Sequence, residues 1–222
     1  MDIAANLKKI KEELGEATLV AVSKTKPNED IQAAYDAGQR VFGENKAREM
    51  EEKAEALPDD IQWHMIGHLQ SNKVKYIAPF VSLIHSVDKL KLLKEINKRA
   101  KQNERVIDVL LQIHIAKEES KFGMDEEEVR ELLQSDTYKE FENIRVVGLM
   151  GMATLTEQQD QIKSEFNYLN SLFQQIKDAY FSDKESFKVL SMGMSGDYKI
   201  ALSCGSTMVR IGSAIFGERE YH

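Results

Sequence analysis

The stretch AVSKTKP, residues 21–27, decides how the rest of this chain is interpreted. Its small and β-branched residues predict a buried strand that ends at Lys24, just before Pro27 turns the chain. Side chains alternate along a strand, so Val20, Val22 and Lys24 share one face. Lysine is rarely buried without a partner, and burial favours its neutral amine, the form that attacks a carbonyl group. The pattern indicates either a reactive lysine or one whose charged end simply reaches solvent.

Short apolar runs alternate with longer, charged and helically periodic runs along the chain. The clearest helical patterns cover residues 88–100 and 162–180. Strands that alternate with helices predict an α/β fold with a parallel sheet. Eight strands match a closed (β/α)₈ TIM barrel, and an open doubly wound sheet is the alternative, although no GxGxxG motif follows the first strand. The expected strands are Thr18–Ser23, Arg40–Phe42, Gln62–Ile66, Ser82–His85, Val106–Ile115, Arg145–Leu149, Lys188–Ser191 and Met208–Ile211.

The composition limits the classes of function. With 222 residues, of which 42% are hydrophobic, the chain can form one large core, and we expect a single domain over residues 1–222. A net charge of −7 argues against binding to nucleic acid, which depends on clustered basic residues. The one cysteine, Cys204, excludes an intramolecular disulfide and suits a reducing compartment.

The N-terminal segment MDIAANLKKIKEEL, residues 1–14, predicts an extra helix ahead of the barrel. Its apolar residues recur at helical spacing between charges, unlike the continuous apolar region of a signal peptide. No stretch approaches the roughly 18 uninterrupted apolar residues that a membrane span needs. We therefore expect no membrane association and a cytoplasmic location.

Polar residues gather near the ends of the last two predicted strands. Phosphate sites of such barrels commonly use the loops after strands seven and eight. Ser195 precedes a short helical pattern at residues 198–203, where it could bind an anion or simply cap the helix. Ser206 and Thr207 begin the eighth strand and Gly212 follows it, so these residues are further candidates for an anion site.

Several basic residues have more than one interpretation. Arg210 lies in the last strand, and because a guanidinium stays protonated, an inward position would require an anion or several acceptors. Lys26 shares the face of Lys24 only if the first strand continues that far; otherwise it is a solvated loop residue. His64 and His68 are left out of the predicted site, since histidines in strands and turns more often satisfy local hydrogen bonds.

Several motifs, in their order and spacing, give the chain a specific resemblance. It closely resembles, over nearly its whole length, the pyridoxal phosphate homeostasis protein family, which has an alanine-racemase-type barrel standing alone (fold type III of pyridoxal phosphate proteins). The last two motifs are highly specific together, whereas a short one such as HSVD is not. The motifs are AVSKTKP (21–27), FGEN (42–45), WHMIGHLQSNK (63–73), HSVD (85–88), GLMGMA (148–153), LSMGMSGD (190–197) and GSTMVRIGSAIFG (205–217).

The resemblance implies that the cofactor is pyridoxal 5′-phosphate (PLP), held as a Schiff base on Lys24. It implies no catalytic residue and no metal. The other implied site residues are Asn45 near the ring, Arg210 facing the pyridine nitrogen, and Ser195, Ser206, Thr207 and Gly212 at the phosphate.

The resemblance also implies a role in PLP homeostasis, in which a monomer buffers PLP or delivers it to apo-enzymes. An arginine at the pyridine nitrogen weakens the ring as an electron sink. Racemases with this barrel take a second acid/base group from an added domain, and the eight units would leave only GEREYH (217–222) for it. A PLP-dependent amino-acid racemase is the alternative, which α-hydrogen exchange would reveal. A Schiff-base aldolase, which would have no chromophore, is a third.

Overall fold

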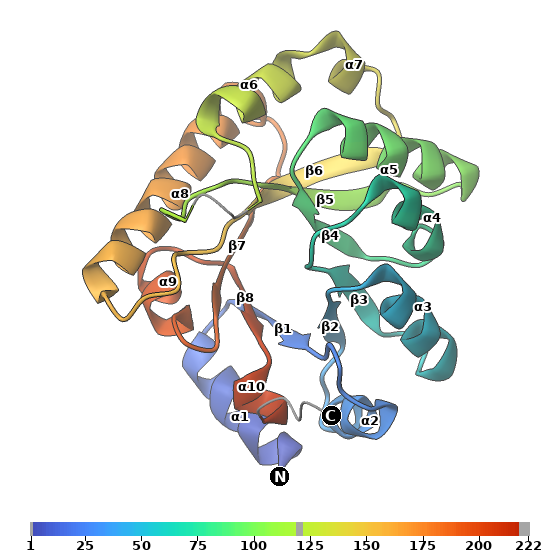
Figure 1. Ribbon diagram of the computed structural model, residues 1–222, viewed down its shortest axis with the longest axis vertical. Coiled ribbons are helices and arrows are strands. Elements are labelled where there is room, and N and C mark those ends of the chain that lie inside the picture. Colours follow the sequence, from blue (N-terminus) through green and yellow to red (C-terminus); the bar gives the residue numbers. More distant parts are fainter. Residues whose placement is uncertain (1, 119–121, 218–222) are drawn as a thin grey trace.

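The strands form a closed parallel barrel in the computed structural model, which describes residues 2–118 and 122–217 (Figure 1). Strands adjacent in sequence are adjacent in the barrel, and β1 closes the ring by pairing with β8. The predicted (β/α)₈ barrel is therefore confirmed, and the open sheet is excluded. The strands are β1 (Thr18–Val22), β2 (Val41–Glu44), β3 (Gln62–Met65), β4 (Leu83–Val87), β5 (Ile107–Gln112), β6 (Ile144–Met150), β7 (Val189–Met194) and β8 (Met208–Ile211).

Helices connect the strands and surround the barrel (Figure 1). The extra N-terminal helix is confirmed as α1 (Ile3–Leu14), whose first turn is capped by the Asp2 side chain. It lies beside α10 (Ser213–Phe216), where Asn6 Nδ2 donates to Ile215 O at 3.0 Å. The others are α2 (Asn28–Asp36), α3 (Ala47–Ala56), the 3₁₀ turn η1 (Ser71–Lys73), α4 (Val74–Ile77), α5 (Leu90–Gln102), α6 (Glu126–Gln134), α7 (Asp136–Lys139), α8 (Gln159–Tyr180) and α9 (Tyr198–Ser203).

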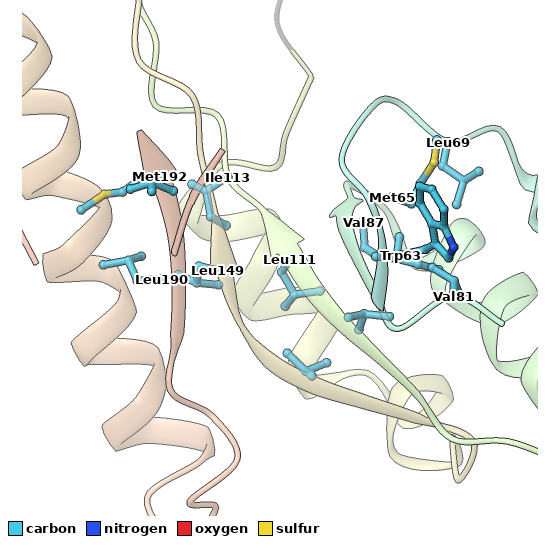
Figure 2. Close-up of a cluster of buried hydrophobic side chains, with 14 of the residues drawn as sticks. Trp63, Met65, Leu69, Val81, Val87, Leu111, Ile113, Leu149, Leu190 and Met192 are labelled. Carbon is cyan, nitrogen blue, oxygen red and sulfur yellow. The ribbon is translucent and has the colours of Figure 1, made fainter. Parts of the chain in front are cut away.

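Alternation along the strands separates two apolar cores. Val20 belongs to a small cluster inside the barrel, while Leu19 belongs to the large cluster between the strands and the helices. Figure 2 shows part of that outer core, including Trp63 of β3 and Leu190 of β7. β1 ends at Val22, one residue before the predicted end at Ser23, so Lys24 lies in a turn just beyond the carboxyl end of the strand.

Several strands end two or three residues later than the sequence indicates. Residues 43–44, 86–87 and 192–194 were expected beyond the ends of the strands, yet they continue β2, β4 and β7. Inside a barrel, polar side chains remain in the strand when they find partners there. Gly193, at φ 102°, also lets α9 approach β7, since a Cβ would lie 2.7 Å from Ala201 Cβ.

The expectation about the C-terminal GEREYH segment concerns residues that, apart from Gly217, lie outside those described.

Candidate functional site

A cavity of about 280 Å³ opens at the carboxyl ends of the strands. Its position is the one at which barrels of this kind carry their active sites. Five of the seven predicted site residues line it, from the ends of β1, β2, β7 and β8. The lining includes Val22, Lys24, Lys26, Asn45, Ile66, Met152, Met194, Ser195, Gly196, Arg210, Gly212, Ser213 and Gly217.

Lys24 lies in a tight turn just after β1 and is half-buried at the cavity wall. The next residue, Thr25, has φ 64°, a left-handed conformation that is unfavourable for a β-branched residue. Two contacts hold the turn: Thr25 N donates to Glu49 Oε1 at 2.5 Å, and Lys26 N donates to Ser23 O at 3.0 Å. The backbone that carries Lys24 is therefore fixed by contacts from α3 and from the turn itself.

A buried ion cluster lies directly behind this turn. Lys53 of α3 donates to Glu44 Oε1 at 2.7 Å, to Glu49 Oε1 at 2.8 Å and to Ser23 O at 2.8 Å. Ser23 Oγ donates to the same Glu44 oxygen at 2.6 Å. Glu44 is fully buried, and its Oε2 has no hydrogen-bond partner within the described part of the chain. The cluster joins β1, β2 and α3 beneath Lys24.

Burial raises the pKa of Glu44 from 4.5 to about 7, although the Lys53 ammonium opposes the shift. A carboxyl whose pKa is raised by folding binds its proton more tightly in the folded state. Its stabilising contribution is complete below pH 4.5 and is lost as the pH rises to about 7. Stability at neutral pH therefore depends on the partners of the charged form, above all on Lys53.

Arg210 points inward, which removes the alternative of an outward arginine. The side chain is only 3% exposed; Nη1 donates to Ser191 Oγ at 2.5 Å and Nη2 to Gly151 O at 3.2 Å. Burial lowers the pKa of Arg210 to about 10, which leaves the guanidinium charged at neutral pH. The cavity wall thus carries a permanent positive charge with further N–H donors.

Ser195 and Gly212 bring the loops after β7 and β8 into contact. Ser195 Oγ accepts a hydrogen bond from Gly212 N at 3.3 Å. The capping interpretation of Ser195 is wrong, because Asp197 occupies the position before α9 and accepts from Met194 N at 2.6 Å. A Cβ at Gly212 would lie 3.1 Å from Val22 O, so glycine permits the close approach of this loop to β1.

Ser206 and Thr207 lie at the opposite end of the barrel, and the structure corrects their predicted position. They precede β8, whose carboxyl end forms the cavity, so their side chains are beneath the strand and not at its mouth. Ser206 Oγ is within hydrogen-bond distance of three backbone carbonyls, the nearest being Met192 O at 2.7 Å. Thr207 Oγ1 accepts from Leu190 N at 2.8 Å. These hydroxyls hold β7 to β8, and we leave both residues out of the proposed site.

Asn45 and Lys26 both line the cavity. Since β1 ends at Val22, the alternative in which the strand continues as far as Lys26 is excluded. Lys26 is nonetheless not a solvated loop residue: it is half-buried, and its Nζ donates to Phe216 O at 2.9 Å. It therefore ties the turn of Lys24 to the end of α10.

Two features escaped the sequence-based site. Ser213 lines the cavity directly after Gly212. Its position next to a residue predicted to bind the phosphate could have identified it from the sequence. His64 lies inside the barrel in a hydrogen-bonded chain with His85 and Ser191. No local sequence pattern indicates that these three residues lie together. Among the described residues, no group of three or more His, Cys, Asp or Glu side chains is placed to hold a metal ion.

Comparisons with known proteins agree with this geometry. Residues 1–220 match the family model described as alanine racemase, N-terminal domain. A pyridoxal phosphate homeostasis protein of Aquifex aeolicus is 42% identical over 92% of this chain and 88% of its own length. Of the helices within residues 2–118 and 122–217, none combines the length and the apolar composition of a membrane-spanning segment.

Solved structures show the same barrel. PipY of Synechococcus elongatus, solved without PLP, is 32% identical and has a TM-score of 0.90 over 97% of this chain and 100% of that chain. Its structure with PLP bound has a TM-score of 0.86. Alanine racemase of Bartonella henselae is 15% identical, with a TM-score of 0.72 over 99% of this chain and 61% of that chain. The last likeness is one of fold alone.

Proposed function

This chain belongs to the pyridoxal phosphate homeostasis protein family, and we propose on that basis that it binds PLP in the cavity at Lys24. The observation that carries the proposal is the lining of that cavity. An amine, a buried guanidinium and a pair of hydrogen-bonded loops all contribute to one cavity of about 280 Å³. A phosphorylated aromatic aldehyde has a matching set of groups: a carbonyl carbon, a ring nitrogen and an anion.

Each polar residue has a role that suits its chemistry. The Lys24 amine would condense with the aldehyde to form a Schiff base, with the aldehyde oxygen leaving as water. The Ser195 hydroxyl and the Gly212 N–H would donate to the phosphate, exchanging their contact with each other for contacts with the anion. Asn45, from the end of β2, would lie beside the ring. Bound PLP would supply an electrophilic ring system.

Arg210 favours binding over catalysis. It can only donate to the ring nitrogen, and it stays charged in its buried position. An unprotonated ring nitrogen withdraws electrons weakly, which disfavours carbanion chemistry. The relative at 42% identity is named as a homeostasis protein, whereas alanine racemase is a likeness at 15% identity. A homeostasis role is therefore favoured over racemase activity.

The finer role that we propose is delivery of PLP by a monomer in the cytoplasm to apo-enzymes. A Schiff base is reversible, and the cavity opens at the end of the barrel, where the cofactor could leave. When the PLP-loaded protein is mixed with an excess of a PLP-requiring apo-enzyme, we expect the apo-enzyme to become active faster than the loaded protein releases PLP into buffer. Activation no faster than this release would contradict delivery and support storage alone.

Light scattering of the PLP-loaded protein tests whether it is a monomer.

Ser195→Ala tests the phosphate end of the site. Loss of a hydrogen bond to a charged group should weaken PLP affinity roughly 10- to 100-fold. Affinity for pyridoxal, which lacks the phosphate, should change less than 2-fold by the same reasoning. Absorbance titrations with both ligands measure this difference.

Two matched variants serve as controls for that titration. Ser203→Ala removes an exposed hydroxyl of α9, and Thr207→Val removes one at the other end of the barrel. Both should retain PLP affinity. An equal loss for PLP and pyridoxal in Ser195→Ala, or a selective loss of PLP in Thr207→Val, would place the phosphate elsewhere.

A further inference from the structure

A chain of buried polar side chains crosses the interior of the barrel and ends on Arg210. His64 Nδ1 and His85 Nε2 are 2.9 Å apart, His85 Nδ1 and Ser191 Oγ are 2.9 Å apart, and Ser191 Oγ meets Arg210 Nη1. Their exposed fractions are 4%, 0%, 0% and 3% in that order. The four residues come from β3, β4, β7 and β8, and three of them have no role in the site described above.

The direction of every hydrogen bond in this chain follows from Arg210. A guanidinium can only donate, so Ser191 Oγ accepts from Nη1. The buried hydroxyl hydrogen of Ser191 then needs an acceptor, and His85 Nδ1 is the one within reach. His85 must therefore carry its proton on Nε2, which donates to His64 Nδ1. His64 in turn carries its own proton on Nε2.

Solvent can satisfy the last donor of this chain. His64 contributes to a second cavity, at the amino ends of the strands, with a volume of about 510 Å³. A neutral His64 can donate its Nε2–H to water there. The chain thus spans the barrel from one end to the other, with all of its donors pointing away from Arg210.

Both histidines stay neutral, so the chain has one charge state. Burial lowers the pKa of His64 to about 3, and burial together with the neighbouring His64 and Arg210 lowers that of His85 well below 6.5. The chain is no path for protons to the cavity, because a guanidinium does not release its proton. The chain is therefore an oriented set of dipoles, and its first acceptor, Ser191 Oγ, fixes one edge of the guanidinium.

We propose that His64, His85 and Ser191 are positioning residues that fix how Arg210 presents its free N–H groups to a ligand in the cavity. Ser191 holds Nη1 and Gly151 O holds Nη2, which defines the plane of the guanidinium. The proposal rests on PLP binding at Lys24, with its ring nitrogen at Arg210. The chain then determines the absorption spectrum of bound PLP and the rate at which PLP is lost.

The first test uses the protein without ligand and is independent of PLP binding. Nitrogen-15 NMR of labelled histidine should show both His64 and His85 neutral, each with its proton on Nε2, from pH 6 to pH 8. The Nδ1–H form of His85, or a charged His85, would overturn the hydrogen-bond directions on which the proposal depends.

The second test uses the PLP-loaded protein. Ser191→Ala should shift the visible absorption maximum and speed the loss of PLP on dialysis by roughly 10-fold, since a hydrogen bond to a charged group is lost. His85→Phe should change the absorption maximum and the rate of PLP loss in the same direction. His85→Asn should keep both close to their wild-type values, because its amide oxygen can replace Nδ1 as an acceptor. His64→Phe, at the far end, should have the smallest effect.

A packing control separates positioning from general damage. Leu110→Ala shortens a buried side chain in the same barrel interior, and because leucine forms no side-chain hydrogen bonds, it removes none from the polar chain. It should lower the melting temperature and leave the spectrum unchanged. The proposal is wrong if Ser191→Ala and His85→Phe leave the spectrum and the loss rate unchanged, or if Asn and Phe at position 85 behave alike. A wild type that binds no PLP would refute the proposed function, while the NMR result would stand.

Discussion

Lys24→Ala is expected to remove the covalent attachment of PLP altogether. Wild-type protein incubated with PLP and then dialysed should be yellow, and borohydride reduction should leave a stable adduct of one PLP per chain. In Lys24→Ala the visible band and the adduct should both disappear, because the proposal assigns the Schiff base to the Lys24 amine, which lines the cavity just after β1. Absorbance spectra and intact mass after reduction measure both results.

Lys26→Met is the matched control for that prediction. Lys26 lines the same cavity two residues away, but its Nζ is directed to Phe216 O. This variant should keep the yellow colour and the adduct. If Lys24→Ala still forms the adduct and Lys26→Met does not, the roles of the two lysines are reversed. A wild type that stays colourless with added PLP would refute the proposed function.

Lys53→Met is expected to destabilise the protein by about 3–5 kcal/mol at pH 8, because it leaves Glu44 buried without its cation. At pH 5 the loss should be smaller, since Glu44, whose pKa is raised to about 7, is protonated there and no longer needs a charged partner. Urea unfolding at the two pH values measures the difference. Loss of Lys53 also releases the Ser23 carbonyl, so retention of PLP at Lys24 should fall as well.

Two further variants define the source of this effect. Glu44→Gln should flatten the fall in stability between pH 4.5 and 7, which we expect to reach up to about 3 kcal/mol in the wild type. Lys98→Met, an exposed lysine of α5, should change stability by no more than about 0.5 kcal/mol. Equal losses for Lys53→Met at pH 5 and pH 8 would contradict a buried carboxylate as the cause.

The barrel and the amine at its mouth could be predicted from local patterns. Apolar runs alternating with helical periodicity indicate βαβ units, and the order of eight of them matches the closed ring. Alternation along the predicted strand put Lys24 on the face of Val20; Val20 does lie inside the barrel, and Lys24, just beyond the end of β1, lines the cavity at its mouth. The sequence left inward and outward positions open for Arg210. The pairing of β8 with β1 decides between them, because Arg210 lies opposite the inward-facing Val20.

The error over Ser206 and Thr207 comes from the ends of a strand. A strand advances about 3.3 Å per residue, so Ser206, four residues before Arg210, lies roughly 13 Å below it. Polar residues before and after β8 suggested one anion site, but only those that follow the strand lie at the mouth of the barrel. The direction of the parallel strands, already implied by the predicted fold, was the signal that excludes the other side.

The polar chain on Arg210 and the ion cluster under Lys24 could not be found from local patterns. His85 and Ser191 are 106 residues apart in sequence and meet only because β4 and β7 both face the same interior. Lys53 lies in the middle of a charged helical run. In the sequence, nothing distinguishes this lysine, which contacts a buried carboxylate, from the exposed charged residues around it. Both features depend on the packing of distant strands and helices, which periodicity does not specify.

A crystal structure of the protein grown with PLP tests the central claim most directly. We predict electron density continuous from the aldehyde carbon of PLP to Lys24 Nζ, with the phosphate between Ser195 and Gly212 and the ring nitrogen within hydrogen-bond distance of Arg210. Density for PLP attached to another lysine, or a phosphate bound at the Ser206 and Thr207 end of the barrel, would contradict it.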